Sequence, residues 1–314
     1  MKKTNNWLTP NERKTIVFFG GEPMLMYDEI IVPLVHYIEN VYNLDEFNLH
    51  ITTNGTLLNK ERIDFLKKYN IFPLLSIDGG KQTQDYNRPC KDKKESSFDL
   101  VAENIPYLLK SFPDVVFRST VYKDSINNLF NDFLYAESMG FKFYTCVPDA
   151  RSHSWTEDDL ELYKNQINKI VSYLINYYLD NLTPKIMFNN LYKALRLVII
   201  NDKNRSYVSD TKTPLRCGMG TVSFSVNYCG QIFACQEQDT RAENGEYFYL
   251  GTIYEGINEE YQKKIINDYI TSTCECEKPG ECETCIMKNV CYHGCPSTQK
   301  DLFNDPGLCS YLVC

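Results

Sequence analysis

The sequence of 314 residues lacks the features of membrane-spanning, secreted and nucleic-acid-binding proteins. Its longest apolar runs, residues 72–77 and 195–200, are far shorter than the roughly 20 residues that cross a bilayer. The first residues carry two lysines but no apolar stretch, so they do not form a secretory signal. The formal net charge of −8 argues against binding to nucleic acid or to an anionic membrane. We therefore expect a cytoplasmic protein.

Cysteine is scarce in the first two thirds of the chain and abundant after them. Of 13 cysteines, 11 lie after residue 216 and eight fall in the last 41 residues. A cytoplasmic protein keeps its thiols reduced, and an odd number of cysteines cannot pair completely within one chain. The clustered cysteines therefore favour metal binding over a disulfide scaffold.

A repeated pattern of short β-branched or aromatic runs, each followed by a helical stretch, occupies residues 15–148. The runs are residues 15–19, 47–53, 73–78, 115–122 and 141–147, and helical stretches include 59–69 and 127–140. Repeated βα units predict a parallel sheet in an α/β fold, either doubly wound or curled into a full or partial barrel. Functional residues then lie at the carboxyl ends of the strands, which here read GGEP, TTNG, SIDGG and RSTV.

The middle of the chain reads as helical over residues 156–200, with Thr156 as the N-cap. The polar, turn-rich residues 201–214 then indicate a domain boundary. We predict a partial barrel over residues 1–150, a helical linker over 151–205 and a cysteine-rich domain over 206–314.

The cysteines of the last domain have a regular spacing. The first group is C-x12-G-x4-C, formed by Cys217, Gly230 and Cys235, with Cys229 directly before the glycine. The second group is C-x2-C-x5-C-x3-C, formed by Cys282, Cys285, Cys291 and Cys295. Converging thiolates suit tetrahedral zinc or an iron–sulfur cluster. Zinc ribbons use two C-x2-C pairs, and the single pair here favours iron–sulfur clusters while leaving zinc as an alternative.

This cysteine pattern resembles the SPASM domain of radical S-adenosylmethionine (SAM) enzymes, which holds two auxiliary [4Fe–4S] clusters. The first half of the chain resembles the same family: GGEP resembles its contact to the amino group of SAM, and SIDGG and RSTV resemble its contacts to the ribose and carboxylate. The resemblance implies a partial (β/α)6 radical SAM barrel followed by a small α+β SPASM domain.

Two sets of site residues follow from the resemblance. SAM would be bound by Gly20, Gly21, Glu22, Pro23, Asn54, Ser76, Asp78 and Arg118. The auxiliary clusters would be held by two groups of thiols: Cys217, Cys235 and Cys295 with Cys229 as a fourth ligand, and Cys282, Cys285 and Cys291 completed by Cys309 in preference to Cys314. A glutamate carboxylate suits an ammonium group, and an arginine suits a carboxylate. Cys274 and Cys276 have no place in the pattern.

One motif of the family does not occur in the sequence. The family holds its catalytic cluster with C-x3-C-x2-C in the loop after the first strand, and no such spacing occurs among the 13 cysteines. We therefore expect the first βα unit to be absent from this chain, because of truncation or a misplaced start or because a partner supplies the unit. Its absence leaves an open sheet edge at residues 15–19. The polypeptide as written is then expected not to cleave SAM alone.

By resemblance, the intact protein would be a maturase that modifies a peptide or protein through hydrogen abstraction by a 5′-deoxyadenosyl radical, with a flavodoxin or ferredoxin as electron donor. Sulfatase-maturing relatives have an aspartate, the proposed base, after the second auxiliary-cluster cysteine. Gln236 stands there in this chain, and an amide cannot accept a proton at neutral pH, which favours a ribosomal-peptide maturase. Two alternatives stay open: a cluster-bearing accessory protein that binds peptide or transfers electrons without cleaving SAM, and a structural zinc protein.

Overall fold

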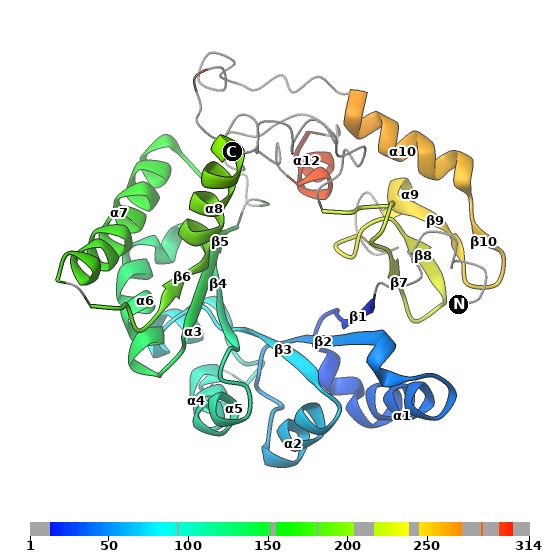
Figure 1. Cartoon of the computed structure of the whole chain (residues 1–314), viewed down its shortest axis with the longest axis horizontal. Coiled ribbons are helices and arrows are strands. Elements are labelled where there is room, and N and C mark those ends of the chain that lie inside the picture. Colours follow the sequence, from blue (N-terminus) through cyan, green and yellow to red (C-terminus); the bar gives the residue numbers. More distant parts are fainter. Residues whose placement is uncertain are drawn as a thin grey trace. The chain divides into compact units, whose positions relative to one another are not determined.

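The computed structural model forms two compact units (Figure 1). The structure describes residues 13–92, 94–149, 151, 155–180, 182–203, 217–238, 245–271, 284 and 295–303. One unit, here called the α/β unit, contains residues 11–149 and 154–193. The other, here called the cysteine-rich unit, contains residues 1–10, 150–153 and 194–314.

The α/β unit is built on a six-stranded sheet whose strands follow in chain order and are all parallel. The strands are β1 (Lys14–Phe18), β2 (Phe47–Thr53), β3 (Ile71–Ser76), β4 (Val116–Val121), β5 (Phe143–Pro148) and β6 (Met187–Phe188). The predicted parallel α/β sheet is therefore confirmed. The first five strands coincide with the predicted runs to within two residues at each end, whereas β6 was not predicted.

Helical segments connect the strands, and Figure 1 shows α1, α2, α5 and α6 along the outer side of the sheet. The segments before β4 are η2 (Pro23–Met26), η3 (Tyr27–Ile31), α1 (Val32–Val41), η4 (Leu44–Glu46), α2 (Lys60–Lys68), α3 (Lys81–Asn87), α4 (Ser97–Ala102) and α5 (Ile105–Ser111). Those after β4 are η5 (Lys123–Asn128), α6 (Leu129–Ser138), α7 (Glu157–Leu179) and α8 (Asn189–Lys203).

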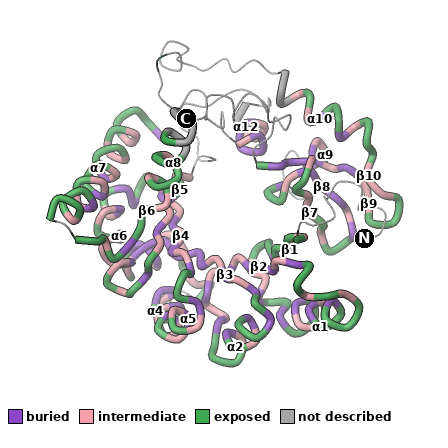
Figure 2. The backbone as a smooth tube through the Cα atoms, viewed as in Figure 1, coloured by how far each residue is buried: buried purple, intermediate pink, exposed green. Residues whose placement is uncertain are grey.

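Burial alternates along the central strands and distinguishes the two faces of the sheet (Figure 2). On β4, Phe117 and Ser119 are buried, whereas Arg118 and Thr120 remain half-exposed. Successive side chains of a strand point to opposite faces. The parallel register places Ser76 of β3 opposite Arg118, so these two predicted site residues share the face with half-exposed side chains.

β1 lies at one edge of the described sheet because it pairs with β2 alone. Val17 keeps 43% of its surface exposed, and Phe19, directly after the strand, keeps 40%. Edge strands present unpaired backbone groups along one side. The strand predicted at residues 15–19 is thus an edge strand of the sheet that the structure describes.

The region predicted as helical over residues 156–200 consists of two helices with a short strand between them. The helix α7 begins with a capping box, in which the Thr156 hydroxyl accepts from the Asp159 N–H and the Asp159 carboxylate accepts from the Thr156 N–H. The predicted N-cap is confirmed. The predicted helical region is interrupted, because α7 ends at Leu179 and β6 then pairs with β5 before α8 begins. Helix α7 belongs to the α/β unit.

The described part of the cysteine-rich unit contains residues 194–203 of α8, a small antiparallel sheet and three further helices. The sheet has the order β10-β9-β8-β7, formed by Gly256–Ile257, Tyr249–Thr252, Gln231–Phe233 and Ser225–Val226. The helices are α9 (Gly245–Phe248), α10 (Glu259–Thr271) and α12 (Pro296–Phe303). Its core contains Met219, Ile232, Ala234, Phe248, Leu250 and Ile265. Throughout the described ranges, no helix combines the length and the apolarity needed to cross a membrane.

Candidate functional site

The GGEP segment forms the turn that follows β1. Gly20 has a φ of +152°, and a Cβ added to Gly20 or Gly21 would meet no heavy atom within 4 Å. Open glycine backbone of this kind allows close approach by a ligand. Pro23 then starts the short helix η2, and Glu22 is its N-cap residue. The turn therefore combines accessible backbone with a carboxylate at one point of the sheet edge.

Glu22 is fixed in place by donors from two segments. Its Oε1 accepts from the Thr53 hydroxyl at 2.7 Å and from the Met24 N–H at 3.0 Å. Its Oε2 accepts from the Asn54 N–H at 2.7 Å. An ionised carboxylate has about four acceptor positions, so one remains for an ammonium donor. The end of β2 thus orients the carboxylate that follows β1.

Asn54 and Gly55 shape the turn after β2. The Asn54 side-chain oxygen accepts from the N–H and the hydroxyl of Thr56, at 2.9 and 2.7 Å, which closes an Asx turn. Gly55 has a φ of +80°, and a Cβ there would lie 2.6 Å from Leu75 Cδ1. Asn54 therefore uses its side chain to form the turn and its backbone N–H to hold Glu22.

Asp78 follows β3, and its carboxylate is completely enclosed. Oδ1 accepts from the Thr120 N–H at 2.9 Å and from Arg88 Nη2 at 3.0 Å, and Oδ2 lies 2.9 Å from Arg88 Nε. The contact to Thr120 extends the link between β3 and β4 beyond the last residue of β3. The arginine neutralises a charge that burial would otherwise make costly. This carboxylate therefore links the end of β3 to β4 and orients Arg88, whose side chain keeps 26% of its surface exposed.

Ser76 and Arg118 lie opposite each other on β3 and β4. Arg118 Nη1 donates to the Thr120 hydroxyl at 2.7 Å, on the same face of β4. Ser76 is buried. Because the Thr120 N–H holds Asp78, Thr120 connects the two predicted residues Asp78 and Arg118.

The charges at this end of the sheet surround the phenol of Tyr122. Burial raises the pKa of Tyr122, and the negative charges of Asp78 and Asp149 raise that pKa further. The positive charges of Arg88 and Arg118 act in the opposite direction. The ion pair of Arg88 with Asp78 and the hydrogen bond of Arg118 to Thr120 place two guanidinium groups at the carboxyl ends of β3 and β4.

Asp132 of α6 holds the glycine pair that follows Asp78. Its Oδ1 accepts from the Gly80 N–H at 2.8 Å, and a Cβ on Gly79 would overlap its carboxyl group. Burial raises the pKa of Asp132 from 3.8 to about 6; hydrogen bonds from Gly80 and Thr83 lower it, and the charge of Asp78 raises it. Gly79 is therefore required by packing against this carboxylate.

Thr53, Arg88 and Asp132 are not among the residues predicted from the sequence. Thr53 stands inside the quoted TTNG segment, so its place at a strand end was a usable signal. Asp132 falls on the apolar face of α6, between the buried Leu129 and Ala136, and a carboxylate at such a position was a second signal. Arg88 follows α3 without a distinctive pattern.

Three predicted cluster ligands, Cys217, Cys235 and Cys295, belong to the described part of the cysteine-rich unit. Burial raises the pKa of the Cys235 thiol to about 11, and the N–H of Glu237 opposes this shift. The negative charge of Glu237 raises this pKa further. Gln238, three residues after Cys235, donates to Ser297, two residues after Cys295, so the segments that carry these two thiols are joined. Their chemistry suits iron or zinc.

Cys229 occupies a different position, on the turn between β7 and β8. The Asn227 side-chain oxygen accepts from the N–H groups of Cys229 and Gln231, both at 3.0 Å, and Gly230 has a φ of +76°. Cys229 is exposed on this turn, whereas Cys235 follows the other end of β8. A three-residue strand rises about 10 Å. The predicted fourth ligand is thus separated from Cys235 by the length of β8.

The second predicted ligand set lies outside the described residues. It contains Cys282, Cys285, Cys291 and Cys309, and Cys274, Cys276 and Cys314 also fall outside. Among the residues that the structure describes, no group of three or more His, Cys, Asp or Glu side chains forms a metal-ion site. The described residues therefore show a link between the segments of Cys235 and Cys295 but no complete ligand set.

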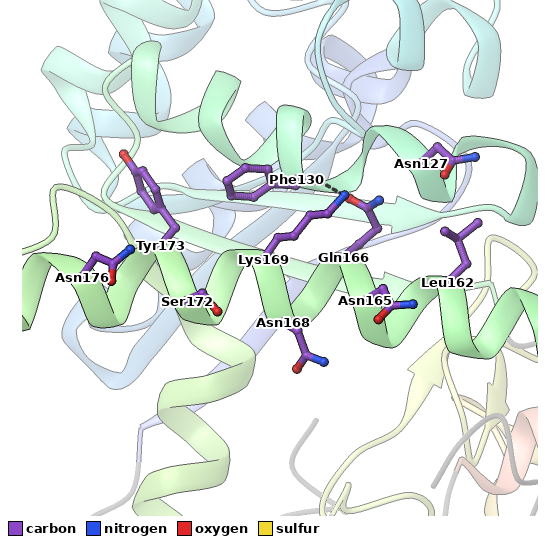
Figure 3. Close-up of a pocket in the computed structure, with 10 residues that line it drawn as sticks. All are labelled: Asn127, Phe130, Leu162, Asn165, Gln166, Asn168, Lys169, Ser172, Tyr173 and Asn176. Atoms are coloured by element: carbon purple, nitrogen blue, oxygen red, sulfur yellow. Dashed lines mark hydrogen bonds between the residues drawn. The ribbon is translucent and has the colours of Figure 1, made fainter.

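A groove of about 780 Å³ lies on the α/β unit beside α7 (Figure 3). Polar side chains line most of it, among them Asn127, Asn165 and Lys169. Gln166 reaches across and accepts from the Phe130 N–H at 3.3 Å, so it caps α6, whose own N-cap residue provides no side-chain hydrogen bond. None of the predicted site residues lines this groove. We interpret it as part of the packing between α6 and α7.

Residues 6–129 match the model of the radical SAM superfamily. The chain therefore carries a radical SAM domain, which includes β1 to β4 and the turns that follow β1, β2 and β3. It is also homologous to anaerobic sulfatase-maturating enzymes. The cysteine-type enzyme of Clostridium novyi is 22% identical over 298 residues, which cover 92% of this chain and 75% of that enzyme.

Two further proteins place this similarity in context. The radical SAM cyclopropyl synthase TigE of Paramaledivibacter caminithermalis is 26% identical over 283 residues, which cover 87% of this chain and 54% of TigE. The chain thus spans about half the length of TigE. Native anSMEcpe with bound AdoMet and Cp18Cys peptide has a similar structure, with a TM-score of 0.72 over 96% of this chain and 81% of that chain. At 18% identity, this likeness concerns the fold.

Proposed function

We propose that the chain is a radical SAM maturase that modifies a side chain of a peptide or protein once a catalytic cluster is supplied to it. The observation that carries this proposal is the carboxylate of Glu22, held by Thr53 and Asn54 beside an open glycine turn in a radical SAM domain. The similarity of the chain to a maturating enzyme, and to a structure solved with a bound peptide, supports a polypeptide substrate.

SAM would bind along the carboxyl ends of β1 to β4. Glu22 would accept a hydrogen bond from its ammonium group, and the backbone of Gly20 and Gly21 would pass close to it. Arg118 would bind its carboxylate and Ser76 would face its ribose. Asp78 would act on this site by holding Arg88. When present, a catalytic cluster would supply the electron that cleaves SAM.

Residues 206–314 would form a SPASM domain with two auxiliary [4Fe–4S] clusters. The hydrogen bonds from Gln238 to Ser297 and Asp301, which join the segments of Cys235 and Cys295, support the first of these clusters. Gln236 follows Cys235 and cannot act as a base, which favours crosslinking or another modification over formylglycine formation. A flavodoxin or ferredoxin would be the electron donor.

Anaerobic purification followed by metal analysis tests the cluster content. We expect a brown protein with about eight irons per chain, four in each [4Fe–4S] cluster. A colourless protein with stoichiometric zinc would instead support a structural zinc protein. The absence of both metals would contradict the assignment of the cysteine-rich unit.

Calorimetric titration with SAM tests the α/β site. We expect Glu22→Gln to weaken SAM binding by about tenfold, because it removes the charge that faces the ammonium group. Equal affinity of the variant and the wild type would contradict the assigned role of Glu22. Formation of 5′-deoxyadenosine by the 314-residue chain with a chemical reductant would contradict the expectation that it cannot cleave SAM alone.

A further inference from the structure

A buried hydrogen-bond network joins the segments that carry Cys235 and Cys295. Gln238 lies three residues after Cys235, in a turn where its N–H donates to the Cys235 carbonyl at 3.3 Å. Gln238 Nε2 donates to Ser297 Oγ at 2.8 Å and lies 2.9 and 3.0 Å from the two carboxylate oxygens of Asp301. Both partners belong to α12, which begins directly after Cys295.

Burial makes the hydrogen bonds of Gln238 costly to break. Gln238 is 1% exposed and Ser297 is completely buried. A buried amide cannot replace lost partners with water, so displacement of α12 would leave both N–H donors of Gln238 unpaired. The hydrogen bond to Asp301 is also charge-assisted, and such bonds are stronger than neutral ones. The turn after Cys235 and the helix after Cys295 are therefore held in one arrangement.

Arg151 adds a weaker contact from a third segment of the same unit. Its Nη2 donates to Ser297 Oγ at 3.1 Å, and its Nη1 and Nε lie 3.4 Å from Glu237 and 3.5 Å from Asp301. Its side chain is 42% exposed, and ion pairs of exposed groups contribute little. The main restraint is therefore Gln238.

We propose that Gln238 is a positioning residue that holds the Cys235 and Cys295 thiols together before any metal binds. The inference rests on the proposed function in one respect, that these thiols receive a cluster. The network itself joins only protein groups, so it would act in the metal-free chain. A cluster then finds two ligands, which are distant in sequence, already adjacent, and its binding does not have to supply the ordering of α12.

The first experiment measures thiol proximity in metal-free protein. Cys217, Cys229 and Cys291 are replaced by Ser, so that the tryptic peptides 217–241 and 289–300 carry one thiol each. Brief treatment with diamide, which takes two electrons and two protons from a thiol pair, is followed by mass spectrometry of the crosslinked peptides. Two variants test the network: Gln238→Ala removes the amide, and Asp301→Asn weakens the same contact without creating a cavity. The control is Gln236→Ala, at an exposed neighbouring position.

We expect Gln238→Ala to slow formation of the crosslink between Cys235 and Cys295 by about tenfold. Asp301→Asn should slow it less, because the variant keeps an oxygen acceptor for Gln238 and loses only the charge that strengthens the hydrogen bond. Gln236→Ala should match the parent. An equal rate in Gln238→Ala, or no crosslink in the parent, would overturn the proposal. A loss of amide-exchange protection in Asp301→Asn that extends from α12 to the sheet of the unit would also overturn it, because the role would then be general stability.

The second experiment uses the reconstituted wild-type chain and measures the release of iron to a chelator. Gln238→Ala should lose iron several-fold faster than the wild type, and Gln236→Ala should not. An unchanged rate in Gln238→Ala would overturn the proposal. A wild type that binds no iron would refute the proposed function, while the crosslinking rates would still decide the role of Gln238.

Discussion

The raised pKa of Asp132 predicts that removing its charge stabilises the fold, whereas removing a hydrogen-bonded carboxylate usually destabilises a protein. Asp132 is buried and accepts from the Gly80 N–H at 2.8 Å, yet burial raises its pKa from 3.8 to about 6. The folded protein therefore holds the neutral form of this carboxyl more favourably than the unfolded chain does. Asp132→Asn keeps an oxygen acceptor for Gly80 and removes the charge.

The sign and size of the effect follow from the two pKa values. Below about pH 4 the carboxyl is protonated in both the folded and the unfolded state, so its ionisation does not change the free energy of unfolding. As the pH rises through about 6, the folded state must ionise a buried group, and stability falls. A shift of about two units corresponds to about 3 kcal/mol. Asp132→Asn should therefore be about 2–3 kcal/mol more stable than the wild type at neutral pH and equally stable near pH 4.

Urea unfolding of the metal-free chain, followed by circular dichroism between about pH 4 and 7.5, measures this difference. Asp158→Asn, at an exposed position in the first turn of α7, is the control and should change stability by a few tenths of a kcal/mol. A variant at Asp132 that is less stable than the wild type at neutral pH would refute the reasoning. So would a difference that stays the same at every pH.

Three further substitutions test other contacts. Thr53→Val removes the hydroxyl that donates to Glu22 and should weaken SAM binding by about tenfold in calorimetry; unchanged affinity would contradict this. Gly230→Ala places a side chain at a φ of +76° and should destabilise the cysteine-rich unit by about 1–2 kcal/mol in urea unfolding; no loss would contradict the strain. Arg88→Met leaves the buried charge of Asp78 without its ion-pair partner and should cost about 3 kcal/mol in urea unfolding; unchanged stability would contradict the ion pair.

The sequence predicted the α/β unit well because the strands differ in character from the segments between them. Short β-branched and aromatic runs recur at the spacing of βα units, and five of the six strands follow them. The sixth strand, Met187–Phe188, is too short to show a period, and its place is decided by pairing with β5. Local sequence cannot report such a pairing, so residues 156–200 read as one helical region.

The candidate site was predictable where a motif carries it and unpredictable where a tertiary contact does. Glu22 stands in GGEP and could be named from the sequence, but its partner Thr53 is 31 residues away. Asp132 lies 52 residues from the Gly80 N–H that it accepts from. These pairs depend on which strands and helices become neighbours, and that information is distributed over the whole fold.

The two glycine pairs of the site show how similar motifs arise from different physical requirements. At Gly20 and Gly21 an added Cβ would meet nothing within 4 Å, so packing does not explain glycine there; the φ of +152° favours glycine at position 20, and the open backbone leaves room for a ligand. At Gly79 an added Cβ would overlap the Asp132 carboxyl group, so packing alone requires glycine. The turn after β1 is therefore the place where this domain offers open backbone to a ligand. The turn after β3 contributes indirectly, through the buried charges of Asp78 and Asp132 that hold it in place.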